Sequence, residues 1–156
     1  MLIFDLKRCG TMKIFIDADG CPVVDITVKA AVKYGLGCTI ICDTSHSIQR
    51  DGAQTITVGK GADSADLRLV NLIGEGDVAV TQDYGLAAMC LGKRAIVLDQ
   101  NGRRYTEDNI QGLLEFRAFS AKLRRSGGRT KGHAKRTARQ DKDFEAALLA
   151  IIGENI

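Results

Sequence analysis

The sequence predicts an α/β protein, a three-layer sandwich in which a mainly parallel five-stranded sheet lies between helices and is followed by C-terminal helices. Two observations carry this prediction. Short runs rich in β-branched residues alternate along the chain with segments of helical spacing. These runs are apolar throughout, which is typical of parallel strands that are buried on both faces. Because crossovers between parallel strands are right-handed, the helices then cover both sides of the sheet.

The five strands are predicted from these short apolar runs, each of which ends near polar residues. They span residues 13–18, 38–43, 54–58, 77–81 and 94–99. Helical spacing in the segments between them predicts helices over 22–34, 62–73 and 84–91. Pro22 suits the first turn of the first of these helices, because its missing N–H would have no partner there in any case.

The C-terminal third predicts two more helices. After a turn in "QNGRRY" (100–105), Thr106 with Asn109 opens a helix that runs to about Arg125 and ends at the glycines 127–128. Thr137 with Gln140 then forms a capping box for the last helix. The apolar positions of that helix recur at helical spacing, at Phe144, Leu148 and Ile151.

Length and composition predict one domain over residues 12–152. The 156 residues, 45% of them hydrophobic, are enough to bury a core without metals or disulfides. Because Met12 directly opens the first strand, residues 1–11 are expected to be a leader from an upstream start or an extension. The sequence contains no apolar stretch that would span a bilayer and no secretory signal, so we expect no membrane partner and a cytoplasmic location. The five cysteines contain no C-x-x-C pair, and Cys38, Cys42 and Cys90 are predicted to be buried free thiols.

Acidic residues follow the predicted strands. Asp17 and Asp19 end the first strand, Asp83 follows the fourth, and Asp63 and Asp66 share one face at a helix start. In parallel α/β sheets the ligand crevice lies outside the carboxyl ends of the strands, where these side chains would converge. Three of them have alternative roles, since Asp63 could cap its helix, Asp19 could begin the first helix and Asp83 could form an Asx turn. Together, however, they would repel one another unless a cation or a raised pKa relieved the repulsion.

The sequence therefore predicts a metal site formed by Asp17, Asp19, Asp63, Asp66 and Asp83. Oxygen ligands without a nearby histidine pair favour Mg²⁺ or Mn²⁺ over zinc, since His46 and His133 lie far apart in the sequence. Such ions on a carboxylate cluster can activate water against a phosphodiester. We therefore expect a divalent-metal-dependent nuclease, in which Asp17, Asp19 and Asp83 are catalytic.

A basic segment supports a nucleic-acid partner. Residues 122–142, "KLRRSGGRTKGHAKRTARQDK", carry many cations and a single acid, whereas the net charge of the whole chain is only +3. Arg125, Arg129, Lys131 and Lys135 are the predicted nucleic-acid-binding residues, with RNA ranked ahead of DNA. The alternative is a solvated linker between helices. The chain has no Trp and only three tyrosines, so it offers few aromatic side chains on which bases could stack. Sequence-specific recognition of single strands therefore has little support.

At these motifs the chain resembles the YaiI/YqxD family of uncharacterised bacterial proteins, usually grouped with PIN-like nuclease domains. The resemblance covers about residues 12–152 and rests on "IDADGCPV", "GADSADLRLVN", "GDVAVTQDYGLAA", "NGRRYTEDNI" and "GGRTKG" in this order. It implies a PIN-like fold and, from the wider PIN-like group, a divalent-metal site built from strand-end and helix-start aspartates. The family itself implies no assigned activity.

Three other functions compete with the nuclease hypothesis. The strongest is a binding module for RNA or protein that keeps the fold and hydrolyses nothing. "DADGC" also resembles the D-x-D-G-T motif of aspartate-based phosphatases, with Cys21 in place of the threonine. Cys21 could itself be a nucleophile because it precedes a helix, but the charges of Asp17 and Asp19 would raise the pKa of its thiol.

Overall fold

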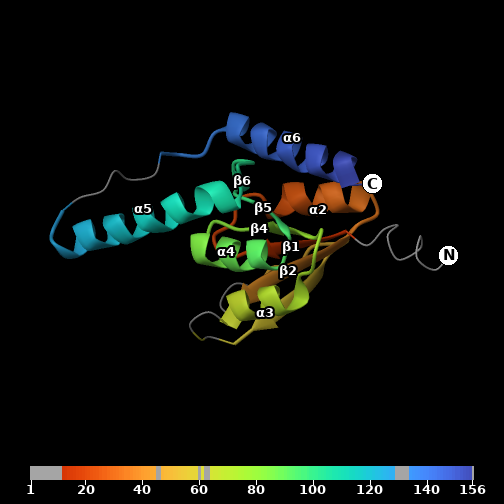
Figure 1. Cartoon of the computed structure of the whole chain (residues 1–156). Coiled ribbons are helices and arrows are strands. Elements are labelled where there is room, and N and C mark those ends of the chain that lie inside the picture. The colour runs from red at the N-terminus through yellow and green to blue at the C-terminus, as the bar shows by residue number, and fades with distance from the viewer. Residues whose placement is uncertain (1–11, 45–46, 60, 62–63, 129–133, 156) are drawn as a thin grey trace.

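A six-stranded sheet forms the centre of the molecule in the computed structural model, which describes residues 12–44, 47–59, 61, 64–128 and 134–155 (Figure 1). The strands are β1 (Lys13–Asp17), β2 (Gly37–Asp43), β3 (Gln54–Val58), β4 (Val78–Val80), β5 (Ile96–Leu98) and β6 (Arg104–Tyr105). Their order across the sheet is β3-β2-β1-β4-β5-β6, and all neighbours are parallel except β5 and β6. The predicted α/β class and mainly parallel sheet are confirmed.

Helices cover both faces of this sheet, which gives the predicted three layers (Figure 1). The helices are α2 (Val24–Lys33), α3 (Ser64–Leu72), α4 (Tyr84–Gly92), α5 (Glu107–Arg125) and α6 (Ala138–Asn155). Helices α2 and α6 pack on one face, and α3, α4 and the first part of α5 pack on the other.

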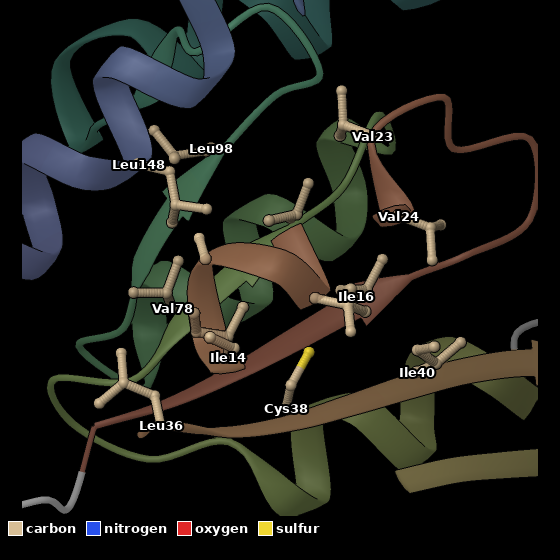
Figure 2. Packing of buried hydrophobic residues seen from close by; sticks show 14 of the residues in the cluster. Ile14, Ile16, Val23, Val24, Leu36, Cys38, Ile40, Val78, Leu98 and Leu148 are labelled. Carbon is tan, nitrogen blue, oxygen red and sulfur yellow. The ribbon is translucent and has the colours of Figure 1, made fainter. Parts of the chain in front are cut away.

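Successive residues of a strand belong alternately to two separate hydrophobic clusters, one on each face of the sheet. Ile14 and Ile16 of β1 point toward α2 and α6, whereas Phe15 between them points toward α3 and α4. Figure 2 shows the first cluster, in which Ile14 lies beside Val78 and which also includes Leu98 of β5 and Leu148 of α6. All these side chains are almost fully buried, which explains why the strand sequences are apolar throughout.

The sheet has one strand more than predicted. The turn expected over 100–105 is correct for its first part, where Asp99 Oδ1 accepts hydrogen bonds from the Asn101 and Arg103 N–H groups. The last two residues instead pair antiparallel with β5. The chain reverses at Gly102, whose φ is +85° and whose absent Cβ would lie 2.8 Å from the Asp143 carbonyl oxygen of α6.

Most predicted helix ends are confirmed. Thr106 with Asn109 forms a reciprocal capping box, and the same pair of hydrogen bonds joins Thr137 to Gln140. Helix α2 differs, because it begins at Val24 and Pro22 lies in the turn before it. Cys38, Cys42 and Cys90 are buried free thiols, as predicted.

Within the described residues, no helix is long and apolar enough to cross a membrane.

Candidate active site

A hollow of about 880 Å³ opens at the carboxyl ends of β1, β2 and β3. Its walls come from these strand ends, from the first turn of α3, from the loop between β4 and α4, and from Arg117 of α5. Five acidic side chains line it, and the last of them stands at the start of α4: Asp17, Asp19, Asp43, Asp66 and Asp83. Strand order changes direction between β1 and β4, so the hollow lies where α/β sheets commonly bind ligands.

Asp17 has a carboxyl group with a raised pKa. It is the last residue of β1 and is half-buried. Burial raises the pKa of its carboxyl from 3.8 to about 6, and the charges of Asp66, Asp19 and Asp83 add to this increase. The Thr81 hydroxyl donates a hydrogen bond of 2.8 Å to Asp17 Oδ2, which lowers the pKa but does not offset the burial.

Thr81 connects the two strand ends beneath the hollow. Its side chain is buried, and its hydroxyl both donates to Asp17 and accepts a 3.0 Å hydrogen bond from the Asp83 N–H. Its carbonyl oxygen accepts a hydrogen bond from the hydroxyl of buried Tyr105 in β6. Thr81 therefore fixes the position of Asp17 relative to the start of α4.

Asp83 caps helix α4. Its Oδ1 accepts hydrogen bonds from the Gly85 N–H (2.8 Å) and the Leu86 N–H (3.1 Å), and the Arg117 guanidinium lies 3.6 Å from the same oxygen. The Asx turn given as the alternative for Asp83 is thus confirmed, and the same oxygen also caps the helix. All of these contacts use Oδ1, and the side chain still borders the hollow at 42% exposure. A cap and a ligand role are compatible, because the carboxylate has a second oxygen.

Asp19 and Asp66 complete the predicted set as far as the structure describes it. Asp19 is exposed in the loop after β1, and Asp66 is half-buried in the first turn of α3. Gly20 turns this loop with a φ of +70°, and its carbonyl oxygen accepts a hydrogen bond from the Gln82 side chain. Asp63 lies outside the described residues.

The described acids do not form a ready metal cage. Among the described residues, no three His, Cys, Asp or Glu side chains are grouped so that they could hold an ion together. Mg²⁺ differs from zinc here, because it commonly keeps several waters and takes only one or two carboxylates from the protein. The all-oxygen donors of the hollow therefore fit a hydrated Mg²⁺ or Mn²⁺ better than any ion that needs a closed protein site.

Two charged residues of the hollow were not predicted from the sequence. Asp43 ends β2 and lines the hollow beside Asp17, and its position in "CTIICD" is the same strand-end signal that identified Asp17. Arg117 comes from the middle of α5 and had no such signal. A Cβ at Gly85 would lie tightly against Asp83 Oδ1 at 3.2 Å and in ordinary contact with the Arg117 guanidinium at 3.6 Å.

The predicted nucleic-acid-binding residues are only partly described. Arg125 is exposed at the last turn of α5, and Lys135 is exposed before α6. Arg129 and Lys131 lie outside the described residues. Their neighbour Arg136 has a structural role, because its guanidinium donates hydrogen bonds to the Gln100 carbonyl oxygen, the Asn101 side chain and Asp141.

Cys21 is poorly suited to act as a nucleophile. Burial raises the pKa of its thiol to about 11, and the charge of Asp17 acts in the same direction. A hydrogen bond from the Val23 backbone and the charge of Arg136 only partly oppose these effects. The thiol is therefore protonated at neutral pH; the predicted increase in its pKa is confirmed, but its main cause is burial, and only Asp17 of the two predicted aspartates contributes.

Comparison with known proteins places the chain in a family. A family model described as the uncharacterized YaiI/YqxD family matches residues 15–154. A "UPF0178 protein" of Exiguobacterium sibiricum is 48% identical over 143 residues, which are 92% of this chain and 98% of the relative. Proteins of the same name from Ruminiclostridium cellulolyticum (50% identical over 90% of this chain and 92% of the relative) and Clostridium acetobutylicum (44% over 90% and 97%) are also similar. No solved structure matches the chain.

Proposed function

The chain belongs to the YaiI/YqxD family, whose description assigns no activity, and we propose from the site itself that it is a divalent-metal-dependent nuclease of PIN-like type. Its substrate would be RNA rather than DNA, and its location the cytoplasm. The observation that carries the proposal is the position of Asp17. A carboxylate with a pKa raised to about 6 borders a large open hollow at the carboxyl ends of the strands.

In this proposal Asp17 and Asp83 hold the cation, with Asp19, Asp43 and Asp66 around them. Asp17 is kept in place by Thr81, and Asp83 by the first turn of α4. Mg²⁺ or Mn²⁺, when bound, supplies a Lewis acid for water attack and neutralises charge on the phosphate. The repulsion among the carboxylates, which raises the pKa of Asp17, is the electrostatic reason for a cation at this place.

Cations on α5 supply the contacts to the nucleic acid. Arg117 borders the hollow, and its side chain is 54% exposed. Its guanidinium can bind a phosphate in exchange for its 3.6 Å contact with Asp83. Arg125 lies eight residues further along the same helix, about 12 Å away at the helical rise. A backbone bound by these two arginines would pass over the carboxylates that otherwise repel it.

The test is hydrolysis of single-stranded RNA and DNA oligonucleotides by the purified protein. Cleavage should require Mg²⁺ or Mn²⁺, stop with chelator, and fall by at least about a hundredfold in Asp17→Asn. Two variants serve as controls. Cys21→Ser should keep most of the activity, and Asp51→Asn makes the same change in an exposed turn outside the hollow.

A non-catalytic binding module is the second candidate. The observation that favours it is that the described His, Cys, Asp and Glu residues offer no group of three around an ion. This function predicts that RNA binding weakens as the salt concentration rises, and that this salt dependence becomes shallower in Arg117→Ala. It also predicts that RNA is bound without cleavage in the presence of either metal. That combination of results would exclude the nuclease. Activity lost in Cys21→Ser and kept in Asp17→Asn would exclude both candidates as drawn.

A further inference from the structure

Helix α5 carries an apolar stripe on the side that faces away from the rest of the molecule. It is 19 residues long, and none of these residues, all of which the structure describes, is buried. Phe116 and Phe119 are each 64% exposed. The C-terminal part of α5 extends beyond the sheet and beyond α4 (Figure 1). Exposed aromatic side chains that are adjacent on one surface commonly mark a protein interface.

The stripe has the spacing of a coiled-coil seam. It consists of Gly112, Phe116, Phe119 and Leu123, which follow one another at intervals of four, three and four residues. This is the a/d pattern with which one helix packs along another. Arg117 lies about 100° around the helix from Phe116, so the seam does not include the side that borders the hollow.

The charges beside the stripe indicate which helix it fits. Glu115 and Lys122 are both exposed and lie seven residues apart, and therefore at the same position of the heptad. The first turn of α5 is acidic, at Glu107 and Asp108, and its last turn is basic. A helix with this pattern complements a copy of itself that runs in the opposite direction.

In such an antiparallel pair the layers match by size as well as by charge. Phe116 of one copy packs on Phe119 of the second copy, and Gly112 makes room for Leu123. Glu115 lies opposite Lys122 of the second copy, and the two-fold axis repeats this pair. A parallel pair would instead bring acidic ends together at one end and basic ends at the other.

We propose that two copies of this chain form a two-fold homodimer by antiparallel packing of their α5 helices along the stripe. The occupant of the stripe is thus a second copy of the same chain. The dimer leaves the Arg117 side of each α5 open, so it does not depend on the nuclease function.

Sedimentation equilibrium of the full chain tests this proposal. The wild type should show a concentration-dependent monomer–dimer equilibrium, and Phe116→Ser with Phe119→Ser should remain monomeric. At a protein concentration at which the wild type is also monomeric, the variant should have the same urea midpoint as the wild type, because dimerisation then adds nothing to the wild-type stability. A wild type that stays monomeric at all concentrations would overturn the proposal. So would a serine variant that loses its fold as a monomer, because the stripe would then be covered by its own chain.

Charge exchange tests the antiparallel direction without touching the apolar residues. Glu115→Lys or Lys122→Glu alone turns two attractive pairs into two repulsive ones and should weaken dimerisation roughly tenfold. The double variant restores both pairs and should dimerise within about threefold of the wild type. Glu145→Lys makes the same change at an exposed position of α6; it is the control and should leave the monomer–dimer equilibrium unchanged. Single variants that dimerise like the wild type, or a double variant without recovery, would overturn the antiparallel arrangement.

Discussion

Replacing Asp17 by Asn should stabilise the protein at neutral pH. The carboxyl of Asp17 has a pKa of about 6 in the folded chain, compared with 3.8 as the ordinary value, mainly because it is buried. A difference of about two units corresponds to about 3 kcal/mol of unfavourable free energy for the ionised carboxylate. The amide removes the charge and keeps an oxygen for the Thr81 hydroxyl, although this neutral hydrogen bond is weaker. We therefore expect a net gain of about 1–3 kcal/mol in the free energy of unfolding.

This gain should depend on pH. The folded state binds the proton of Asp17 more tightly than the unfolded chain does, so the wild type has its full stability from this group below about pH 3.8. It loses that stability as the pH rises through about 6. The difference between Asp17→Asn and the wild type should consequently be largest near neutral pH and small near pH 4.

Urea unfolding in the presence of chelator measures this difference at several pH values. Asp51→Asn is the matched control, because it removes one negative charge from an exposed turn and should change the stability by less than about 0.5 kcal/mol. An Asp17→Asn protein that is no more stable than the wild type at neutral pH, or a gain that persists unchanged at pH 4, would refute the reasoning. The carboxylate would then be stabilised by its surroundings rather than strained by them.

Two further substitutions test the groups around the site. Thr81→Val should cost about 2–3 kcal/mol in urea unfolding, because it leaves the Asp17 carboxylate and the Asp83 N–H without their shared hydroxyl, whereas Thr81→Ser should be close to wild type. NMR titration should also show a higher pKa for Asp17 in Thr81→Val, since this hydrogen bond lowers it. Arg136→Ala should cost about 2 kcal/mol, because the Arg136 side chain is only 23% exposed and loses hydrogen bonds to three partners. Arg139→Ala should cost less than about 0.5 kcal/mol, because Arg139 is 82% exposed in its i,i+4 pair with Asp143. Equal losses of stability in the two variants would contradict this.

Periodicity and strand-end chemistry were sufficient to predict most of the fold and part of the site. The apolar runs identify the five parallel strands, and parallel pairing then brings residues that end different strands to one edge. For this reason Asp17, at the end of β1, and Asp83, 66 positions later and just after β4, could be predicted to border one site. Asp43 was missed although it follows the same rule. β6 was missed because two residues are too few to show a period.

The contributions of α5 and α6 to the site depend on how whole helices pack. Arg117 reaches the hollow because α5 packs on α4 at one particular angle, and no local pattern specifies that angle. Arg136 resembles the other cations of the basic segment in sequence. Its structural role depends on carbonyl and side-chain groups about 35 positions earlier, which only the folded chain brings near it. Basic composition alone therefore cannot separate phosphate-binding cations from structural ones.

The hydrogen bonds of the aspartates that end or follow the strands differ in a way that bears on function. Asp83 and Asp99 accept backbone N–H groups, the usual arrangement for a carboxylate that holds a turn or a helix end. Asp17 instead accepts the hydroxyl of buried Thr81, whose own carbonyl is held by Tyr105. This arrangement fixes the position of Asp17 without neutralising the effect of its burial. A carboxylate that is held in place but left electrostatically unfavourable contributes little to the fold, and this is the reason why we propose a positively charged ligand beside it.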